Sequence, residues 1–297
     1  MGFELQGHRG ARGLFPENTL EGFGATIALG VDAIELDVAV TADGVPVVFH
    51  DVALNGDIVR GPDGAWLEGE GPLLRSLTLA GLARYDVGRL RPGSRYAAAW
   101  PDQVPCDGAR VPTLGEAFAA TGPVRIAAEL KTVPELPWAS VPPAVMAERV
   151  LEVAASCGAL GRLEVRSFDW RGLRHLRACC PGLALTFLTS AETVARAALW
   201  WDGPGPAGYG GSVPRAVAAV AAGAGWAPDH RGLTQAQVRE ARSLGLRVLP
   251  WTVNDPADMA RLIGWEVDGF CTDRPDLARQ AMARAGLPLP PAGCRRG

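Results

Sequence analysis

The sequence predicts an α/β protein in which eight strand–helix units close into a (β/α)8 TIM barrel, and three observations lead to that fold class. Short apolar strand patterns alternate with helix patterns along most of the chain, which favours a mainly parallel sheet. Eight strand patterns remain once a hairpin arm is set aside, and no G-x-G-x-x-G or P-loop motif favours an open sheet. The length of 297 residues suits a closed barrel, which needs about 250 residues plus insertions.

The first unit begins with the strand pattern FELQGH, residues 3–8, and continues with a helix pattern over residues 16–30. Pro16 and Glu17 suit the first turn of this helix, because proline lacks the amide hydrogen and an acidic side chain favours the positive end of the helix dipole. Gly30 is a helix stop.

The second strand, residues 31–40, is joined to another strand, residues 45–50, by only TADG. A parallel crossover needs a dozen or more residues, so this connection predicts a hairpin. A turn centred between the second and third residues of TADG places Glu35 opposite His50. Asp37 then lies on the same face as Glu35, because side chains alternate along a strand.

Residues 52–112 are rich in Gly, Pro, Asp and Arg and predict a small, irregular insertion after the second-strand hairpin. The alternation resumes with a helix near Thr113, and Asp169, Ser190 and Asp273 are expected to cap later helices. The remaining strands are expected within residues 124–131, 162–168, 183–189, 223–228, 246–253 and 267–272, and helices within 142–158, 169–180, 190–201, 234–245, 255–264 and 274–286.

Composition limits the class of protein. With 48% hydrophobic and 21% charged residues the chain can bury one large core, so a single barrel domain is expected over residues 1–285, with a disordered tail over 286–297. The net charge of −3 and the lack of a basic stripe argue against nucleic acid as a partner. No apolar run approaches the ~18 residues of a membrane span and no leader pattern is visible, so a cytoplasmic protein is expected. The sequence does not indicate an oligomeric state.

Residues able to carry chemistry gather where the strand patterns end, which is the catalytic face of barrels of this kind. A single histidine at a strand end is usually incidental, but many charged groups on one rim are costly to gather without a ligand or a metal. In chain order these residues are His8, Arg9, Glu35, Asp37, His50, Glu129, Lys131 and Trp251.

Three of these residues are carboxylates. Glu35, Asp37 and Glu129 are hard oxygen ligands, which suit a divalent cation such as Mg²⁺ or Ca²⁺. The alternative is that they form ordinary salt bridges with Arg9 and Lys131. No H-x-H, H-E-x-x-H or clustered Cys/His pattern indicates zinc.

The other residues favour phosphoester chemistry. Arg9 and Lys131 suit an anionic oxygen, Arg9 through its bidentate fork and Lys131 as a point charge. His8 and His50 are then available as general acid and general base. Trp251 is either barrel packing or a flat wall of the substrate site.

Several of these segments together resemble the glycerophosphodiester phosphodiesterase family, and the match runs in order over nearly the whole chain. Each fragment alone is a weak signal, whereas the combination is highly specific. The segments are HRG followed by PENTLEGF, then AIELDVAVTADGVPVVFHD, PTLGEAF, AELK, VRSFD, VLPWTVND and VDGFCTDRPD.

The resemblance implies that the protein is an enzyme, a phosphoric diester hydrolase, with the motif histidines His8 and His50 as its catalytic pair. It implies that the three carboxylates bind the divalent metal and that the two cations hold phosphate. The implied reaction releases glycerol 3-phosphate and an alcohol through a cyclic phosphate formed by the substrate's own glycerol hydroxyl. Many members carry R-T-T-x-G after the HD motif, whereas this chain has LNGDIVRGPDGAW, so the resemblance does not imply which alcohol is released.

Two other functions remain open at this point. A lysophospholipase D would use the same residues on lysolipids, and it would need an apolar groove that the insertion does not clearly supply. A barrel that binds phosphodiesters without catalysis is favoured only by the loss of a motif residue, and none is lost. The expected partner in each case is a small molecule containing a phosphodiester.

Overall fold

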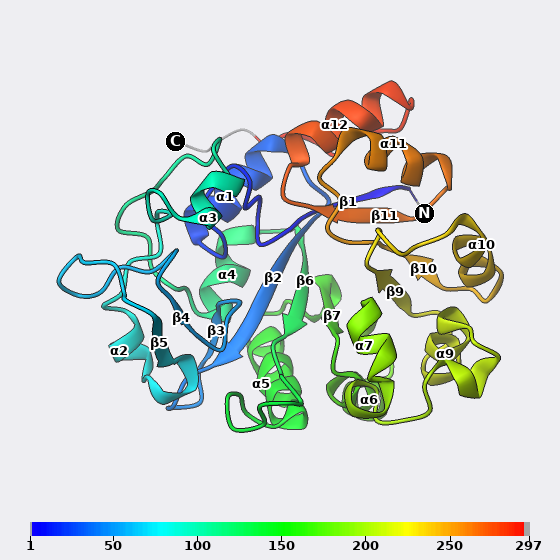
Figure 1. The fold of residues 1–297 in the computed structure, drawn as a ribbon, viewed down its shortest axis with the longest axis horizontal. Coiled ribbons are helices and arrows are strands. Elements are labelled where there is room, and N and C mark those ends of the chain that lie inside the picture. The colour runs from blue at the N-terminus through cyan, green and yellow to red at the C-terminus, as the bar shows by residue number, and fades with distance from the viewer. Residues whose placement is uncertain (1, 294–297) are drawn as a thin grey trace.

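The computed structural model describes residues 2–293, and its centre is a nearly closed barrel of eight parallel strands (Figure 1). Strand β11 pairs with β1, and backbone hydrogen bonds of 3.0 Å from Asp268 N to Val248 O and from Cys271 N to Pro250 O connect it to the β10 side. The predicted fold class is therefore confirmed. The barrel strands are β1 (Glu4–Gly7), β2 (Ala33–Val40), β6 (Arg125–Leu130), β7 (Leu163–Ser167), β8 (Ala184–Thr189), β9 (Gly225–Pro228), β10 (Arg247–Val248) and β11 (Gly269–Thr272), and β3 (Pro46–Val48) is the hairpin arm on β2.

Helices surround the barrel and cover its apolar outer face (Figure 1). They are α1 (Leu20–Leu29), α4 (Leu114–Thr121), α5 (Pro143–Ser156), α6 (Trp170–Cys179), α7 (Ala191–Ala195), α8 (Ala197–Trp200), α9 (Val213–Val220), α10 (Gln235–Ser243), α11 (Pro256–Gly264) and α12 (Pro275–Arg284). The helix predicted over residues 190–201 is interrupted at Arg196, whose φ of −114° and ψ of 31° are not helical. Helix α9 has no counterpart among the predicted helices. No helix in the described part of the chain combines the length and apolarity needed to cross a membrane.

Helix α1 begins at Leu20, later than predicted. Asn18 has a φ of +55°, so the chain is not helical there, and the hydroxyl of Thr19 caps the first turn instead. Pro16 and Glu17 therefore lie in the loop before the helix rather than in its first turn. This loop connects β1 to α1 at the carboxyl end of the barrel.

The hairpin between β2 and β3 differs from the prediction by one residue. Val38 faces Val48, so the connecting loop contains five residues and the partners are shifted. The loop accommodates its extra residue with Gly44 at a φ of +80°. The predicted pairing of Glu35 with His50 is therefore wrong, and His50 lies beyond the last paired residue of the hairpin.

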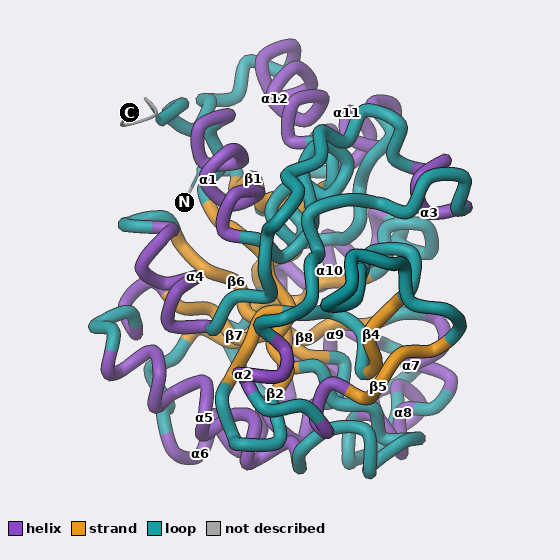
Figure 2. The backbone as a smooth tube through the Cα atoms, turned by 90° about the vertical axis from the view of Figure 1, so that its left-hand side faces the viewer, coloured by secondary structure: helices purple, strands orange, loops and turns teal. Residues whose placement is uncertain are grey.

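The insertion contains short elements separated by loops, which extend over one side of the barrel in Figure 2. A small apolar core of its own, including Leu54, Val59 and Leu82, packs against Val47 and Phe49 of the hairpin. The insertion is therefore anchored to the strand that leads to His50. Its elements are β4 (Ala53–Asn55), β5 (Glu70–Leu73), the 3₁₀ turn η1 (Leu74–Ser76), α2 (Leu79–Leu82) and α3 (Arg95–Ala99).

The predicted tail is described only as far as residue 293. Within it, Pro290 is buried and its carbonyl accepts a hydrogen bond of 2.7 Å from Arg279, which also donates to Gly30 at the end of α1. Residues 294–297 lie outside the described part of the chain.

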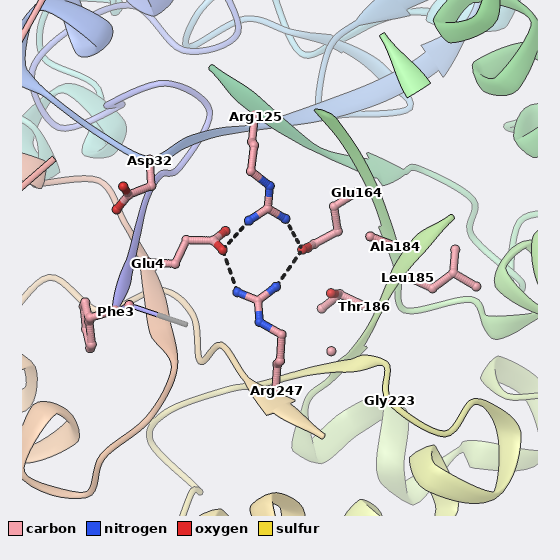
Figure 3. A pocket seen from close by; sticks show the side chains of 12 residues that line it. Phe3, Glu4, Asp32, Arg125, Glu164, Ala184, Leu185, Thr186, Gly223 and Arg247 are labelled. Carbon is pink, nitrogen blue, oxygen red and sulfur yellow. Dashed lines mark hydrogen bonds and ion pairs between the residues drawn. The ribbon is translucent and has the colours of Figure 1, made fainter. Parts of the chain in front are cut away.

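The amino ends of the strands surround a polar hollow of about 560 Å³, shown in Figure 3. Glu4 accepts hydrogen bonds of 2.5 Å from Arg125 and 2.6 Å from Arg247. Glu164 completes the ring, with oxygen–nitrogen distances of 3.4 and 3.9 Å to the same two arginines. The hollow is larger than the one at the carboxyl ends, but its two arginines are already paired with Glu4 and Glu164. These ion pairs link strands across the amino-terminal end of the barrel.

Candidate active site

A cavity of about 170 Å³ opens at the carboxyl ends of the strands. It brings together residues that are far apart in the sequence, and most of those predicted above are among them. Its predicted lining residues are His8, Arg9, Glu35, His50, Glu129, Lys131 and Trp251, and its other lining residues are Arg12, Arg166, Phe168, Leu188, Thr252 and Cys271. Asp37, the remaining predicted residue, lies beside Glu35 and Glu129.

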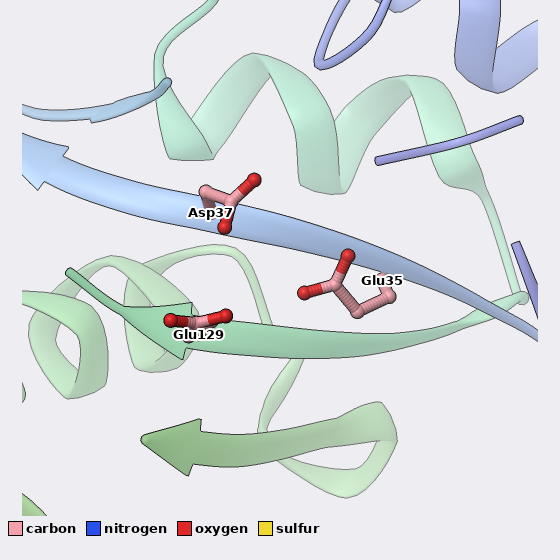
Figure 4. A group of neighbouring side chains, drawn as sticks. All are labelled: Glu35, Asp37 and Glu129. Carbon is pink, nitrogen blue, oxygen red and sulfur yellow. The ribbon is translucent and has the colours of Figure 1, made fainter. Parts of the chain in front are cut away.

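The three carboxylates come from two adjacent strands (Figure 4). Glu35 and Asp37 share one face of β2 because they are two residues apart, and the parallel register sets Asp37 beside Glu129 of β6. Each residue contributes an oxygen atom, and these atoms lie within 4.8 Å of one another. All three residues are buried, so their charges interact in a region with little solvent screening.

The carboxylates do not ionise alike. Burial, and next the negative charge of Asp37, raise the pKa of Glu35 to about 8. Burial opposes the ionisation of Asp37 as well. The basic side chains around it, those of His50, Arg9 and Lys131, nevertheless hold the pKa of Asp37 well below its ordinary range.

The cations of the chain neutralise only part of this group. Lys131 Nζ lies 2.7 Å from Glu129 Oε1 and 3.5 Å from Asp37 Oδ1, and Arg9 Nε lies 3.3 Å from Asp37 Oδ2. Among the described residues, no Lys or Arg forms an ion pair with Glu35, and Asp37 Oδ1 is buried without a hydrogen-bond donor. Three buried oxygen ligands, one of them without a donor, fit a hard divalent cation. Salt bridges from Arg9 and Lys131, the alternative to a metal, do form, but they leave Glu35 and one oxygen of Asp37 available to a cation.

The two histidines are held in the same way. His8 Nδ1 lies 2.6 Å from Asp273 Oδ1, and His50 Nδ1 lies 2.6 Å from Asp51 Oδ1. A carboxylate on Nδ1 fixes the ring and leaves Nε2 as the nitrogen that exchanges protons. Burial lowers the pKa of His8 from its ordinary value, against the opposing effect of Asp273, and so favours the neutral ring.

Asp273 was expected to cap the last helix, and that expectation is wrong. The N-cap position of α12 belongs to Arg274, which makes no side-chain cap. Asp273 instead contacts His8, accepts two hydrogen bonds of 3.0 Å from Arg12, and accepts one of 2.7 Å from Asn254. The available signal was its position directly after the last barrel strand, where the other site residues are also found.

Two glycines around His8 and Arg9 have a geometric explanation. A Cβ atom on Gly7 would lie 2.1 Å from the carbonyl oxygen of Gly10, so only glycine fits there. Arg9 and Gly10 both have positive φ, at +50° and +86°, which turns the chain sharply after the strand. The turn directs the backbone N–H of Arg9 to Glu35 at 3.0 Å, so the loop is fitted around the carboxylates.

Trp251 contributes to both packing and the cavity wall. Its indole nitrogen donates to Ala227 O at 2.9 Å, and its ring meets Phe168 edge-on with a centroid distance of 5.2 Å. Both aromatic rings line the cavity. The packing role of Trp251 is therefore confirmed, and its contact with substrate stays a prediction.

Comparison with known proteins identifies the family of this chain. The model of the Glycerophosphoryl diester phosphodiesterase family matches residues 8–277. The chain belongs to this family. It is accordingly a phosphodiesterase, as the resemblance implied.

Individual relatives of this phosphodiesterase agree in length and fold. It is 31% identical to a glycerophosphodiester phosphodiesterase of Bacillus subtilis over 283 residues, which is 91% of this chain and 83% of that protein. A Silicibacter pomeroyi protein that is described as a glycerophosphoryl diester phosphodiesterase has a known crystal structure. Its sequence is 37% identical to this one, the alignment covers 96% of this chain and 95% of that one, and the two structures superpose with a TM-score of 0.86.

A more distant structure shares the fold. It is an Oleispira antarctica phosphodiesterase in complex with the product sn-glycerol-3-phosphate, 23% identical, with a TM-score of 0.69. It covers 94% of this chain and 96% of that one.

The ionisation of the phosphodiesterase site gives a first prediction. Below pH 8 the metal-free site holds a proton on Glu35 that a cation must displace, because the pKa of Glu35 is about 8. Affinity for Mg²⁺ or Ca²⁺ is therefore expected to rise between about pH 6 and 8 and to level off above. Calorimetric titration in buffers of different ionisation enthalpy measures both the affinity and the released proton.

Asp37→Asn is expected to abolish this binding, whereas Glu21→Gln, which changes an exposed carboxylate on α1, leaves it intact. Binding that is independent of pH, or unchanged in Asp37→Asn, contradicts the assignment.

Proposed function

We propose that this protein hydrolyses glycerophosphodiesters to glycerol 3-phosphate and an alcohol, with His8 and His50 as the acid–base pair and a divalent cation in the carboxylate triad. One observation carries the proposal. Two histidines, each with a carboxylate on Nδ1, line one cavity together with Arg9, Lys131 and two carboxylates of the metal-fitting triad, and the third carboxylate lies beside those two. The glycerol 3-phosphate held by the Oleispira antarctica protein supports the choice of product.

The histidines carry out the proton transfers. One accepts the proton of a glycerol hydroxyl as that oxygen bonds to phosphorus, and the other donates a proton to the alcohol oxygen as its bond to phosphorus breaks. A cyclic phosphate results. Water then opens it, with the two histidines exchanging roles, so that the net reaction is hydrolysis. The rings keep their orientation throughout because Asp273 and Asp51 hold Nδ1 in each.

The charged residues serve the phosphate. Arg9 and Lys131 place positive charge at the cavity wall, where it offsets charge that develops on the phosphate oxygens. When bound by Glu35, Asp37 and Glu129, Mg²⁺ or Ca²⁺ supplies Lewis-acid stabilisation and orients the glycerol hydroxyls.

A lysolipid substrate is the second candidate. The loop after β6, on the same rim as the cavity, exposes Trp138 at 60% and Leu136 at 38% of their surfaces. Such side chains are able to contact an acyl chain. Hydrolysis that increases with acyl-chain length supports this candidate, and activity on water-soluble glycerophosphodiesters alone supports the first.

The decisive assay is release of glycerol 3-phosphate from glycerophosphocholine and glycerophosphoethanolamine, after EDTA treatment and after addition of Mg²⁺ or Ca²⁺. We expect activity that requires the metal, and a kcat lowered by about 10²–10⁴-fold in His8→Ala and in His50→Ala, because each histidine carries one proton transfer. His175→Ala, which changes a partly exposed histidine on α6, is the control and retains activity. A folded, metal-loaded protein that cleaves neither these substrates nor lysolipids is a phosphodiester-binding barrel instead.

Asp273→Asn tests how His8 is held. Asp273 raises the pKa of His8 against the lowering caused by burial, so its loss lowers that pKa further. The acid limb of the kcat/KM profile is therefore expected to move to lower pH, while kcat falls by about 100-fold because the ring loses its orientation. Asp276→Asn, which removes a carboxylate paired with Arg274, is the matched control. An unchanged acid limb together with an unchanged kcat argues against this role.

A further inference from the structure

We propose that Tyr96, in helix α3 of the insertion, is a positioning residue for this reaction, because its hydroxyl joins the group of residues that holds Arg9 to the group that holds His8. The inference rests on the proposed function and extends it to a residue outside the cavity. Tyr96 does not line the cavity and touches no predicted catalytic group. It acts through two partners in the loop between β1 and α1.

The first partner is Glu17. Its Oε2 accepts a hydrogen bond from the Tyr96 hydroxyl, and its Oε1 accepts one of 2.8 Å from Arg9. The other side of the Arg9 guanidinium faces Asp37 at 3.3 Å. Glu17 and Arg9 are both buried, so the position of Arg9 beside the triad depends on a carboxylate that Tyr96 holds in place.

The second partner is Arg12. Its guanidinium donates to the Tyr96 hydroxyl at 3.1 Å and, through two other nitrogens, to Asp273 at 3.0 Å. Asp273 is the carboxylate on His8. Trp100 lies against the same guanidinium, with its ring centroid 5.0 Å away. Tyr96 and Trp100 therefore confine the arginine that in turn confines Asp273.

The phenol is suited to this position because it is both donor and acceptor. Burial, and next the charge of Glu17, raise the pKa of Tyr96 far above its ordinary value. The hydroxyl therefore keeps its proton and donates a hydrogen bond to Glu17. Its oxygen remains free to accept from Arg12. No other neutral side chain of this length offers both functions on a rigid ring.

Neighbouring residues of the insertion hold the same loop. Gln103 donates to the carbonyl of Arg12 at 2.8 Å, and Val104 N donates to the carbonyl of Leu14 at 2.8 Å. Asp102 pairs with Arg274, next to Asp273, at 3.0 Å. The segment from Tyr96 to Val104 is therefore laid along the loop that carries Arg9 and Arg12, and the insertion takes part in building the site.

Tyr96→Phe tests the inference, because it keeps the ring beside Arg12 and removes only the hydroxyl. We expect kcat on glycerophosphocholine to fall by about tenfold while KM changes less than about threefold, since misplacement of Arg9 and His8 affects the transition state more than substrate binding. Tyr85→Phe is the matched control, because Tyr85 is half-buried against the core of the insertion and its hydroxyl forms no hydrogen bond with any described residue. It is expected to retain full activity.

A double variant of Tyr96→Phe and Glu17→Gln tests whether Tyr96 acts through Glu17 or only stabilises the fold in general. If Tyr96 acts through Glu17, adding Tyr96→Phe to Glu17→Gln lowers kcat by much less than tenfold further. Activity of Tyr96→Phe within twofold of wild type overturns the inference, and two effects that simply multiply overturn the part of it that runs through Glu17.

Hydrogen–deuterium exchange gives a measure that needs no substrate. Backbone amides in residues 9–18 are expected to exchange faster in Tyr96→Phe than in wild type and to be unchanged in Tyr85→Phe. Unchanged exchange in Tyr96→Phe overturns the inference. If the wild-type protein cleaves no phosphodiester, the proposed function fails, and exchange still decides whether Tyr96 holds this loop.

Discussion

The site depends on one electrostatic constraint, which is that three buried carboxylates lie together on two adjacent strands. Such groups repel one another strongly where water is excluded, and they persist only when positive charge or protons compensate them. Lys131 and Arg9 compensate Glu129 and Asp37, whereas Glu35 is left with a raised pKa of about 8. The divalent cation that we propose for this site would resolve the imbalance and attract a substrate phosphate to the same place.

The groups around the triad are each fixed by a partner from a distant part of the chain. Asp273 after the last strand orients His8, and Tyr96 of the insertion is placed to hold the loop that carries Arg9. The barrel closes β11 against β1, which is what brings the last strand beside the first histidine. The fold thus pairs the first and last barrel strands, and its insertion covers the loop between β1 and α1.

The sequence was sufficient for the barrel and for the residues gathered at its rim, because strand–helix alternation and strand-end positions are local patterns. It was insufficient where the outcome depends on nonlocal contacts. The hairpin register moved by one residue because the loop closed with five residues and a left-handed Gly44, which placed Glu35 away from His50. The position of Asp273 after the last strand indicates the rim of the barrel, but it does not identify His8, 265 residues away, as its partner.

The most direct test of this account is anomalous X-ray diffraction from crystals soaked in Mn²⁺, which substitutes for Mg²⁺ at oxygen-rich sites. The account predicts an anomalous peak in contact with all three of Glu35, Asp37 and Glu129, with His8 and His50 still held by their carboxylates. A protein without a peak there, in which the chain's own cations alone neutralise the three carboxylates, contradicts it.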